Sequence, residues 1–199
     1  GTIENVYGGG SDGGITYNAN VFIESNPTIT GNVYGGGENS AIGSQDTQGT
    51  ATVNIVSGTI PNDVIGGSNN GVVYGKTIVN IGQDAVNRPD LQAGNISIKG
   101  NVYGAGSMPD EEDSEEDTED TEDTNTSYVS VTNGTQTNIN SNNHAMFEIA
   151  GTIFGTGKNV VYEGEANIDI TNTGTSENIQ TFTSIDNANN VTISNSNIE

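Results

Sequence analysis

The sequence predicts an all-β protein that winds into a parallel β-helix, or β-solenoid, with coils of irregular length. Three observations carry this prediction: a short motif recurs along the chain, the apolar residues are mostly scattered Val and Ile, and glycine stands at 28 positions. Only 31% of the residues are hydrophobic. A solenoid tolerates this low share because each coil buries only a thin line of side chains against its neighbours.

The recurring motif is Asn-Val-Tyr-Gly followed by further small residues. Near-copies begin at Asn5, Asn32 and Asn101, and weaker versions cover 63–67 and 152–157. The aromatic position, or its substitute, recurs after 27, 31, 38 and 51 residues, at Tyr7, Tyr34, Ile65, Tyr103 and Phe154. Repeats of this length are typical of solenoids and propellers, and the unequal spacing argues against a propeller, whose blades must be similar.

Strands are predicted at the motif and between its copies. An Ile stands four residues before the motif Val, as in Ile60 and Val64, and this even spacing predicts that both lie on one face of one strand. Pairs of β-branched residues two apart predict partner strands, at Val53 with Ile55, Ile96 with Ile98, Val129 with Val131, Ile168 with Ile170, and Val191 with Ile193. Two strands per coil are the minimum. No window shows a sustained helical period, so we expect a nearly all-β chain.

Two segments account for the longest spacings between motif copies. Residues 84–94 contain Arg88-Pro89-Asp90 and predict a corner loop. Residues 107–126 form an insertion in which 110–123 carries eleven of the 26 acidic residues, and dense like charge without apolar residues predicts a disordered loop. We expect residues 1–199 to be a single solenoid domain and, because the pattern is cut at both ends, a fragment of a longer repeat protein.

The motif residues have predicted structural roles. The Val is expected to be buried between coils, and the glycines to stand where a Cβ would collide with the coils above and below. The Asn before the Val suits a stacked corner in which side-chain amides bond to one another along the axis.

The NVYGGG segments at 5–10 and 32–37, NVYGAG at 101–106, and the GTI openings at 1, 58 and 151 resemble the Gly-, Asn- and Thr-rich parallel β-helix repeats of adhesin-like surface proteins of bacteria and archaea. The resemblance implies an extracellular location, at the cell surface or in the cell wall. It also implies a structural or adhesive role, with a glycan or a host surface molecule as partner and neighbouring repeats of the same longer chain alongside. It transfers no catalytic residue.

The aromatic residues of the motif are the candidate ligand-binding residues. Tyr7, Tyr34, Tyr103 and Phe154 occupy equivalent positions, and Ile65 interrupts the series. Because the preceding Val points inward, strict alternation predicts outward rings that form a surface ladder with a step of about 4.8 Å. Such a ladder suits the apolar C–H faces of sugars. The alternative is that the glycine turn tucks each ring over the coil edge.

The acidic run is the candidate metal site. Its oxygen ligands favour a hard cation, chiefly Ca²⁺, and the candidate diffuse ligands are Asp110, Glu111, Asp113, Asp117, Asp120 and Asp123. The spacing is not that of an EF-hand, so Ca²⁺ is the one cofactor considered and no other is expected. A net charge of -22 disfavours nucleic acid as a partner. No apolar run approaches the ~20 residues of a membrane span, so no membrane insertion is expected.

The alternative function is that of a polysaccharide-active β-helix enzyme, either a lyase or a glycoside hydrolase. Enzymes that resemble pectate lyases use basic residues with Ca²⁺ on acidic polysaccharides, and the four scattered bases here would leave such a substrate repelled. His144 stands in a polar turn and is expected to be solvated rather than a general base. Carboxylates on adjacent coils could form a hydrolytic pair. The sequence favours a non-enzymatic structural and adhesive module.

Overall fold

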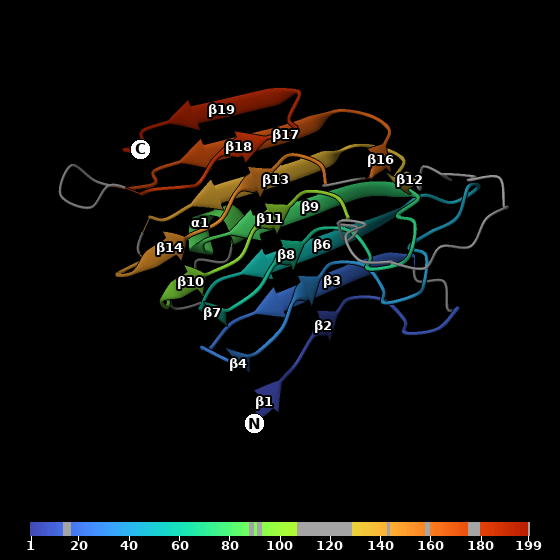
Figure 1. Ribbon diagram of the computed structural model, residues 1–199, viewed down its shortest axis with the longest axis horizontal. Helices are drawn as coiled ribbons and strands as arrows, with labels where there is room; N and C mark the ends of the chain where they lie inside the picture. Colours follow the sequence, from blue (N-terminus) through green and yellow to red (C-terminus); the bar gives the residue numbers. More distant parts are fainter. Residues whose placement is uncertain are drawn as a thin grey trace, which may run out of the picture.

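The chain is a parallel β-helix built of short strands, which confirms the predicted fold class (Figure 1). A computed structural model describes residues 1–13, 17–87, 90, 93–106, 129–142, 144–157, 160–174 and 180–198. The predicted acidic insertion at 107–126 lies outside these residues.

Three parallel sheets run along the stack, one on each face of the coil. Sheet 1 has five strands, namely β1 (Thr2–Ile3), β4 (Thr28–Ile29), β7 (Gly58–Ile60), β10 (Ile96–Ile98) and β14 (Phe147–Ile149). Sheet 2 has six strands, namely β2 (Val6–Tyr7), β5 (Val33–Tyr34), β8 (Val64–Ile65), β11 (Val102–Tyr103), β15 (Ile153–Phe154) and β18 (Ile185–Asp186).

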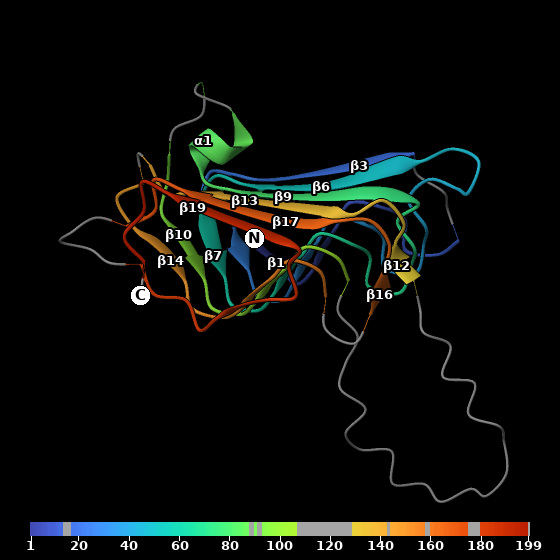
Figure 2. The same ribbon diagram turned by 90° about the horizontal axis from the view of Figure 1, so that it is seen from above.

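Sheet 3 is built from the longer strands. Its six strands are β3 (Asn18–Ile23), β6 (Gly49–Ile55), β9 (Gly75–Ile81), β13 (Thr135–Asn140), β17 (Ala166–Thr171) and β19 (Asn190–Ser194). A short pair, β12 (Val129–Val131) and β16 (Val161–Tyr162), lies between sheets 2 and 3 in chain order. Figure 2 shows sheet 3 as a long layer on one side of the stack, with the short strands of the other sheets opposite.

The core consists of Val and Ile side chains stacked coil on coil. In sheet 3 one buried row contains Ile23, Ile55, Ile81, Ile139 and Ile170 in register, and Ile193 continues it on the last coil, where it is half-exposed. The predicted strand over Ile60 and Val64 is wrong in one respect. Ile60 ends β7 in sheet 1 and Val64 begins β8 in sheet 2, so a turn separates two buried residues that belong to different sheets. Each coil therefore has three faces, one more than the predicted minimum.

The motif asparagines form a ladder, although not the predicted one between side-chain amides. The side-chain oxygen in one coil accepts the backbone N–H of the equivalent residue in the next. Asn5 accepts from Asn32 at 2.8 Å, Asn32 from Asp63 at 2.9 Å, and Asp63 from Asn101 at 2.6 Å. The position needs a short side chain with an acceptor oxygen, which explains why Asp63 can replace Asn.

The first glycine of the motif is required by close packing along the stack. A Cβ on Gly35 would collide with the carbonyl oxygen of Gly66, and a Cβ on Gly104 would collide with that of Gly155. Neither Gly35 nor Gly104 has a positive φ. The collision predicted from the sequence is therefore confirmed. Glycine is required here because a Cβ would not fit, and not because of a left-handed backbone conformation.

The corner loop predicted at 84–94 contains a single helical turn that the sequence did not indicate. Helix α1 (Gln83–Val86) ends at Asn87, which adopts a left-handed conformation with φ of 57°. Within the described part of the chain, no helix is long and apolar enough to cross a membrane.

Candidate functional site

The motif aromatic rings cluster apart from the Val and Ile core, as alternation predicts, but they form two stacked pairs separated by Ile65 rather than a displayed surface ladder. The rings of Tyr7 and Tyr34 stack with centroids 4.9 Å apart, and those of Tyr103 and Phe154 with centroids 4.7 Å apart. Tyr34 and Tyr103 are only 7% and 4% exposed, because they pack against Ile65 and their stacked neighbours. The two inner rings are therefore buried rather than displayed, and ligand binding by this row remains a prediction.

Burial also affects the ionisation of the ladder. Burial is the main cause that raises the pKa of Tyr34, and Tyr7 and Asp63 add to the rise. Burial, with Glu38 and Glu4, raises the pKa of Tyr7. Both phenols are therefore neutral at physiological pH and act as packed rings within the stack.

The predicted Ca²⁺ ligands between Asp110 and Asp123 lie outside the described residues, so no geometry bears on them. Among the described residues, no group of three or more His, Asp or Glu side chains is placed to hold a metal ion.

His144 is not the solvated residue that the sequence predicted. Its Nε2 accepts the backbone N–H of Gln83 at 2.8 Å, and its Nδ1 lies 2.7 Å from the carbonyl oxygen of Gly94. A carbonyl accepts only, so these partners assign the ring proton to Nδ1. The imidazole thus fastens both ends of the α1 insertion to the coil that carries it. Backbone groups occupy both nitrogens, which indicates a structural role.

Two neighbouring cavities open at the corner between sheets 3 and 1. The first, of about 390 Å³, is lined by Glu24, Ser57 and Gly94 among others, and the second, of about 440 Å³, by Pro27, Thr28, Thr59 and Met146 among others. Asn26 and Asn95 line both cavities, which therefore adjoin, and we call the two together the groove. Its lining offers amide, hydroxyl and carboxylate groups beside an exposed thioether.

The sharp corner that creates the groove has a backbone cause. The chain leaves sheet 3 through a residue of positive φ, such as Asn26 at 52° and Gly58 at 135°, and Ser25 at 63° precedes the first of them. Asn tolerates the left-handed region better than other residues with a Cβ, because its short side chain can bond locally. Polar residues therefore gather at this corner for conformational reasons and also line the groove.

Sheet 1 carries a row of polar side chains, of which Thr28 and Thr59 line the groove and Ser97 is buried. Thr28, Thr59, Ser97 and Glu148 stand in register on four consecutive coils. Glu148 Oε2 accepts from Lys99 Nζ at 2.5 Å and from Ser97 Oγ at 3.1 Å. The hydrogen bond from Lys99, more than that from Ser97, lowers the pKa of Glu148, so this carboxylate is ionised at neutral pH.

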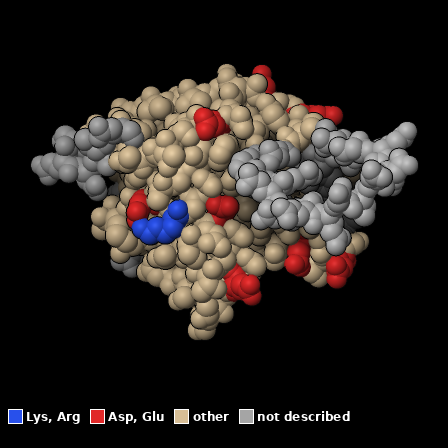
Figure 3. Space-filling view, viewed as in Figure 1, with Lys and Arg blue, Asp and Glu red and all other residues tan. Residues whose placement is uncertain are grey.

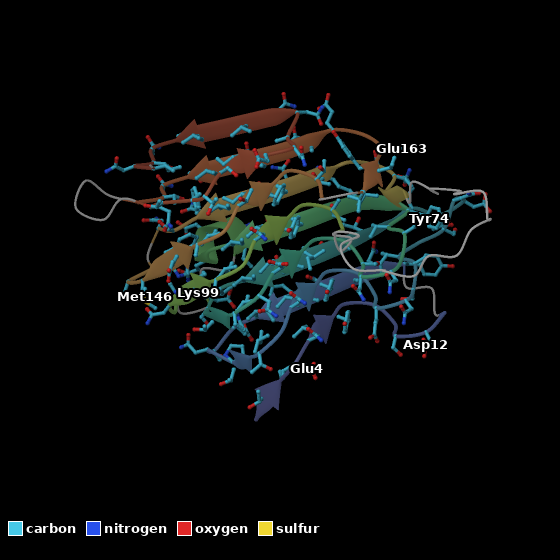
Figure 4. All side chains as sticks on the ribbon, in the orientation of Figure 1. Glu4, Asp12, Tyr74, Lys99, Met146 and Glu163 are labelled. Carbon is cyan, nitrogen blue, oxygen red and sulfur yellow. The ribbon has the colours of Figure 1, made fainter. Side chains whose placement is uncertain are left out.

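Figures 3 and 4 show the charged end of this row. Figure 4 places Lys99 and Met146 together beside β10 and β14. On the face seen in Figure 3, the blue basic atoms adjoin red carboxylates, and further red carboxylates are scattered over the rest of the face.

The sequence did not predict the groove or the row. Asn26, Ser57, Asn95 and Met146 are separated along the chain by intervals of 31, 38 and 51 residues, and only the strand register aligns them. Comparison with protein-family models, with curated proteins and with solved structures finds no match to the chain.

Proposed function

We propose that this chain is a structural and adhesive module of a microbial cell-surface protein that binds a glycan and does not cleave it. The observation that carries the proposal is the groove shared by Asn26 and Asn95, whose amides have no hydrogen bond to other described residues. Amide and hydroxyl groups held on a rigid stack can bond sugar hydroxyls at little cost in side-chain ordering.

The arrangement of carboxylates favours binding over hydrolysis. Glycoside hydrolases place two carboxyl groups about 5–5.5 Å or 6.5–9.5 Å apart. Glu24 lines the groove and Glu148 belongs to the strand row, and the two lie on coils three steps apart, or on the order of 14 Å at the usual strand spacing. The alternative, a polysaccharide lyase or glycoside hydrolase, would have to use a different pair of groups.

The cell-surface location rests on the resemblance of the NVYGGG and GTI repeats to adhesin-like proteins. A solenoid suits such a location because coils can be added along one axis without a change of fold. Ca²⁺ bound by the acidic run would be compatible with this role.

A glycan array combined with a reducing-sugar assay tests the proposal. We expect the chain to bind immobilised glycans and to release no reducing ends from the glycans that it binds. Turnover that a single carboxylate substitution abolishes would instead establish the enzymatic alternative. Failure to bind any glycan would refute the adhesive role.

A further inference from the structure

We propose that sheet 1 and the adjoining corner form an elongated site for a neutral oligosaccharide that lies along the solenoid axis. The inference rests on the proposed glycan binding and adds to it a place, a direction and a ligand class. We call this surface the sheet 1 patch. It consists of a strand row, Thr28, Thr59, Ser97 and Glu148, and a corner row, Asn26, Ser57, Asn95 and Met146. Ser57 and Ser97 are buried in these rows and hold their neighbours, Ser57 Oγ by accepting from the N–H of Asn26 and Ser97 Oγ by donating to Glu148.

The register of sheet 1 gives the patch its shape. Each corner-row residue stands two positions before its strand-row partner, at the corner that precedes the strand. Residues of both rows, Asn26, Asn95 and Met146 with Thr28 and Thr59, line one cavity and therefore share a surface. Neighbouring strands are about 4.8 Å apart, so four coils extend the patch over roughly 14 Å. That length exceeds one sugar ring and matches a short chain of sugars rather than a monosaccharide.

Unused hydrogen-bonding capacity distinguishes this patch from the other polar face of the molecule. On the outer face of sheet 3, the amides of Asn54, Asn80 and Asn138 bond to one another at 2.9 and 2.8 Å. In the patch, the Asn26 and Asn95 side chains form no bond to other described residues. A ligand on sheet 3 would have to break protein hydrogen bonds, whereas a ligand on sheet 1 would replace water.

Glu148 provides the strongest acceptor in the patch. Lys99 and Ser97 both bond to its Oε2, so Oε1 remains able to accept a hydroxyl from a ligand. Hydrogen bonds to an ionised carboxylate are stronger than neutral ones, and this group is already held in place by two partners. We therefore assign Glu148 as a determinant of affinity.

Charge disfavours an acidic ligand. The carboxylates of Glu24 and Glu148 stand near a single described ammonium group, that of Lys99, which is paired. Together with the net charge of -22, this arrangement repels acidic glycans. Met146, 45% exposed, adds an apolar surface for the C–H face of a sugar.

The test uses isothermal titration of the whole chain with disaccharides, tetrasaccharides and hexasaccharides. The neutral probes are polymers of glucose, galactose, mannose and N-acetylglucosamine, with an oligogalacturonate and an oligoglucosamine as charged comparisons. We expect a neutral probe to bind, and affinity to rise from disaccharide to tetrasaccharide. Glu148→Gln should weaken binding about tenfold or more, since it removes a hydrogen bond to a charged group. Asn95→Ala and Thr59→Val should weaken it severalfold.

Thr52→Ala, an outward change on sheet 3, is the matched control and should bind like the parent, with melting curves recorded for every variant. If a neutral probe binds the parent and all three patch variants equally, the site is wrong although the proposed function stands. If no glycan binds the parent, both fail. Tighter binding of either charged probe than of every neutral one would overturn the ligand class.

Discussion

Thr137 offers the sharpest test of the packing described above. It points inward from β13, is fully buried, and is in register with Val79 on one side and Ile168 on the other. Its hydroxyl is the one buried side-chain polar atom among the described residues that lacks a hydrogen-bond partner. Thr137→Val replaces this hydroxyl by a methyl group of similar size and should stabilise the chain.

The magnitude follows from the cost of burying an unbonded hydroxyl, about 1–3 kcal/mol on the scale of protein substitutions. We expect a gain of about 1–2 kcal/mol in the free energy of unfolding, or a rise in Tm of roughly 2–8 °C for a chain of this length. Thr135→Val is the matched control. Thr135 lies in the same strand and is equally buried, but its hydroxyl donates to the carbonyl oxygen of Gly155. Its removal should cost about 1 kcal/mol.

Thermal and urea unfolding followed by circular dichroism measure both variants. Val79→Thr provides the reciprocal change, because it places a second hydroxyl in the same inward row. It should lower Tm by about as much as Thr137→Val raises it. A fall in Tm for Thr137→Val would refute the reasoning, since it would mean that the hydroxyl is bonded in solution.

Three further predictions follow from the stack. Asp63→Asn should keep the parental Tm, whereas Asp63→Ala should cost about 1–3 kcal/mol in thermal melts, because the N–H of Asn101 loses its acceptor. Gly35→Ala should lower Tm more than Gly13→Ala. A Cβ at position 35 would collide with backbone atoms of the next coil. A Cβ at position 13 would have open space around it, and that substitution would cost about 1–2 kcal/mol because of the φ of +60°. The pKa of Glu148 is lower in the folded chain than its ordinary value of 4.5, which applies to the unfolded chain. The ion pair with Lys99 therefore stabilises the folded chain fully above pH 4.5, and this stabilisation is lost as the pH falls through the folded pKa. Glu148→Gln should therefore cost less than about 1 kcal/mol at pH 7 and nothing in stronger acid, as urea titrations at both pH values would show.

The fold class was predictable because a solenoid repeats its local rules. The recurrence of Val before an aromatic and glycine predicted both the inward row and the close contact between coils. The third face was missed although a signal existed. Pro61, Asn62 and Asp63 between Ile60 and Val64 are turn formers, and they indicate that the even spacing crosses a corner.

Side-chain contacts between neighbouring coils that lie far apart in the sequence were not predictable. His144 bonds to Gln83 and Gly94, which lie 61 and 50 residues earlier in the chain. The surrounding sequence is polar and shows no pattern that names these partners. A histidine in a polar turn is expected to be solvated. Here the α1 insertion packs against His144 and supplies backbone partners for both of its ring nitrogens.

The difficulty of locating a binding site here has a physical origin in the asparagines themselves. Asn80 and Asn95 are the same residue type, and each stands beside an Ile. Register gives Asn80 an Asn above and below, so its amide completes a ladder. The same register gives Asn95 a Ser on one side and a Met on the other, and its amide is left to solvent. The amino-acid composition therefore predicts that the chain forms a stack of coils. The residues that the strand register places beside each asparagine decide whether its amide bonds within the stack or remains open to a ligand.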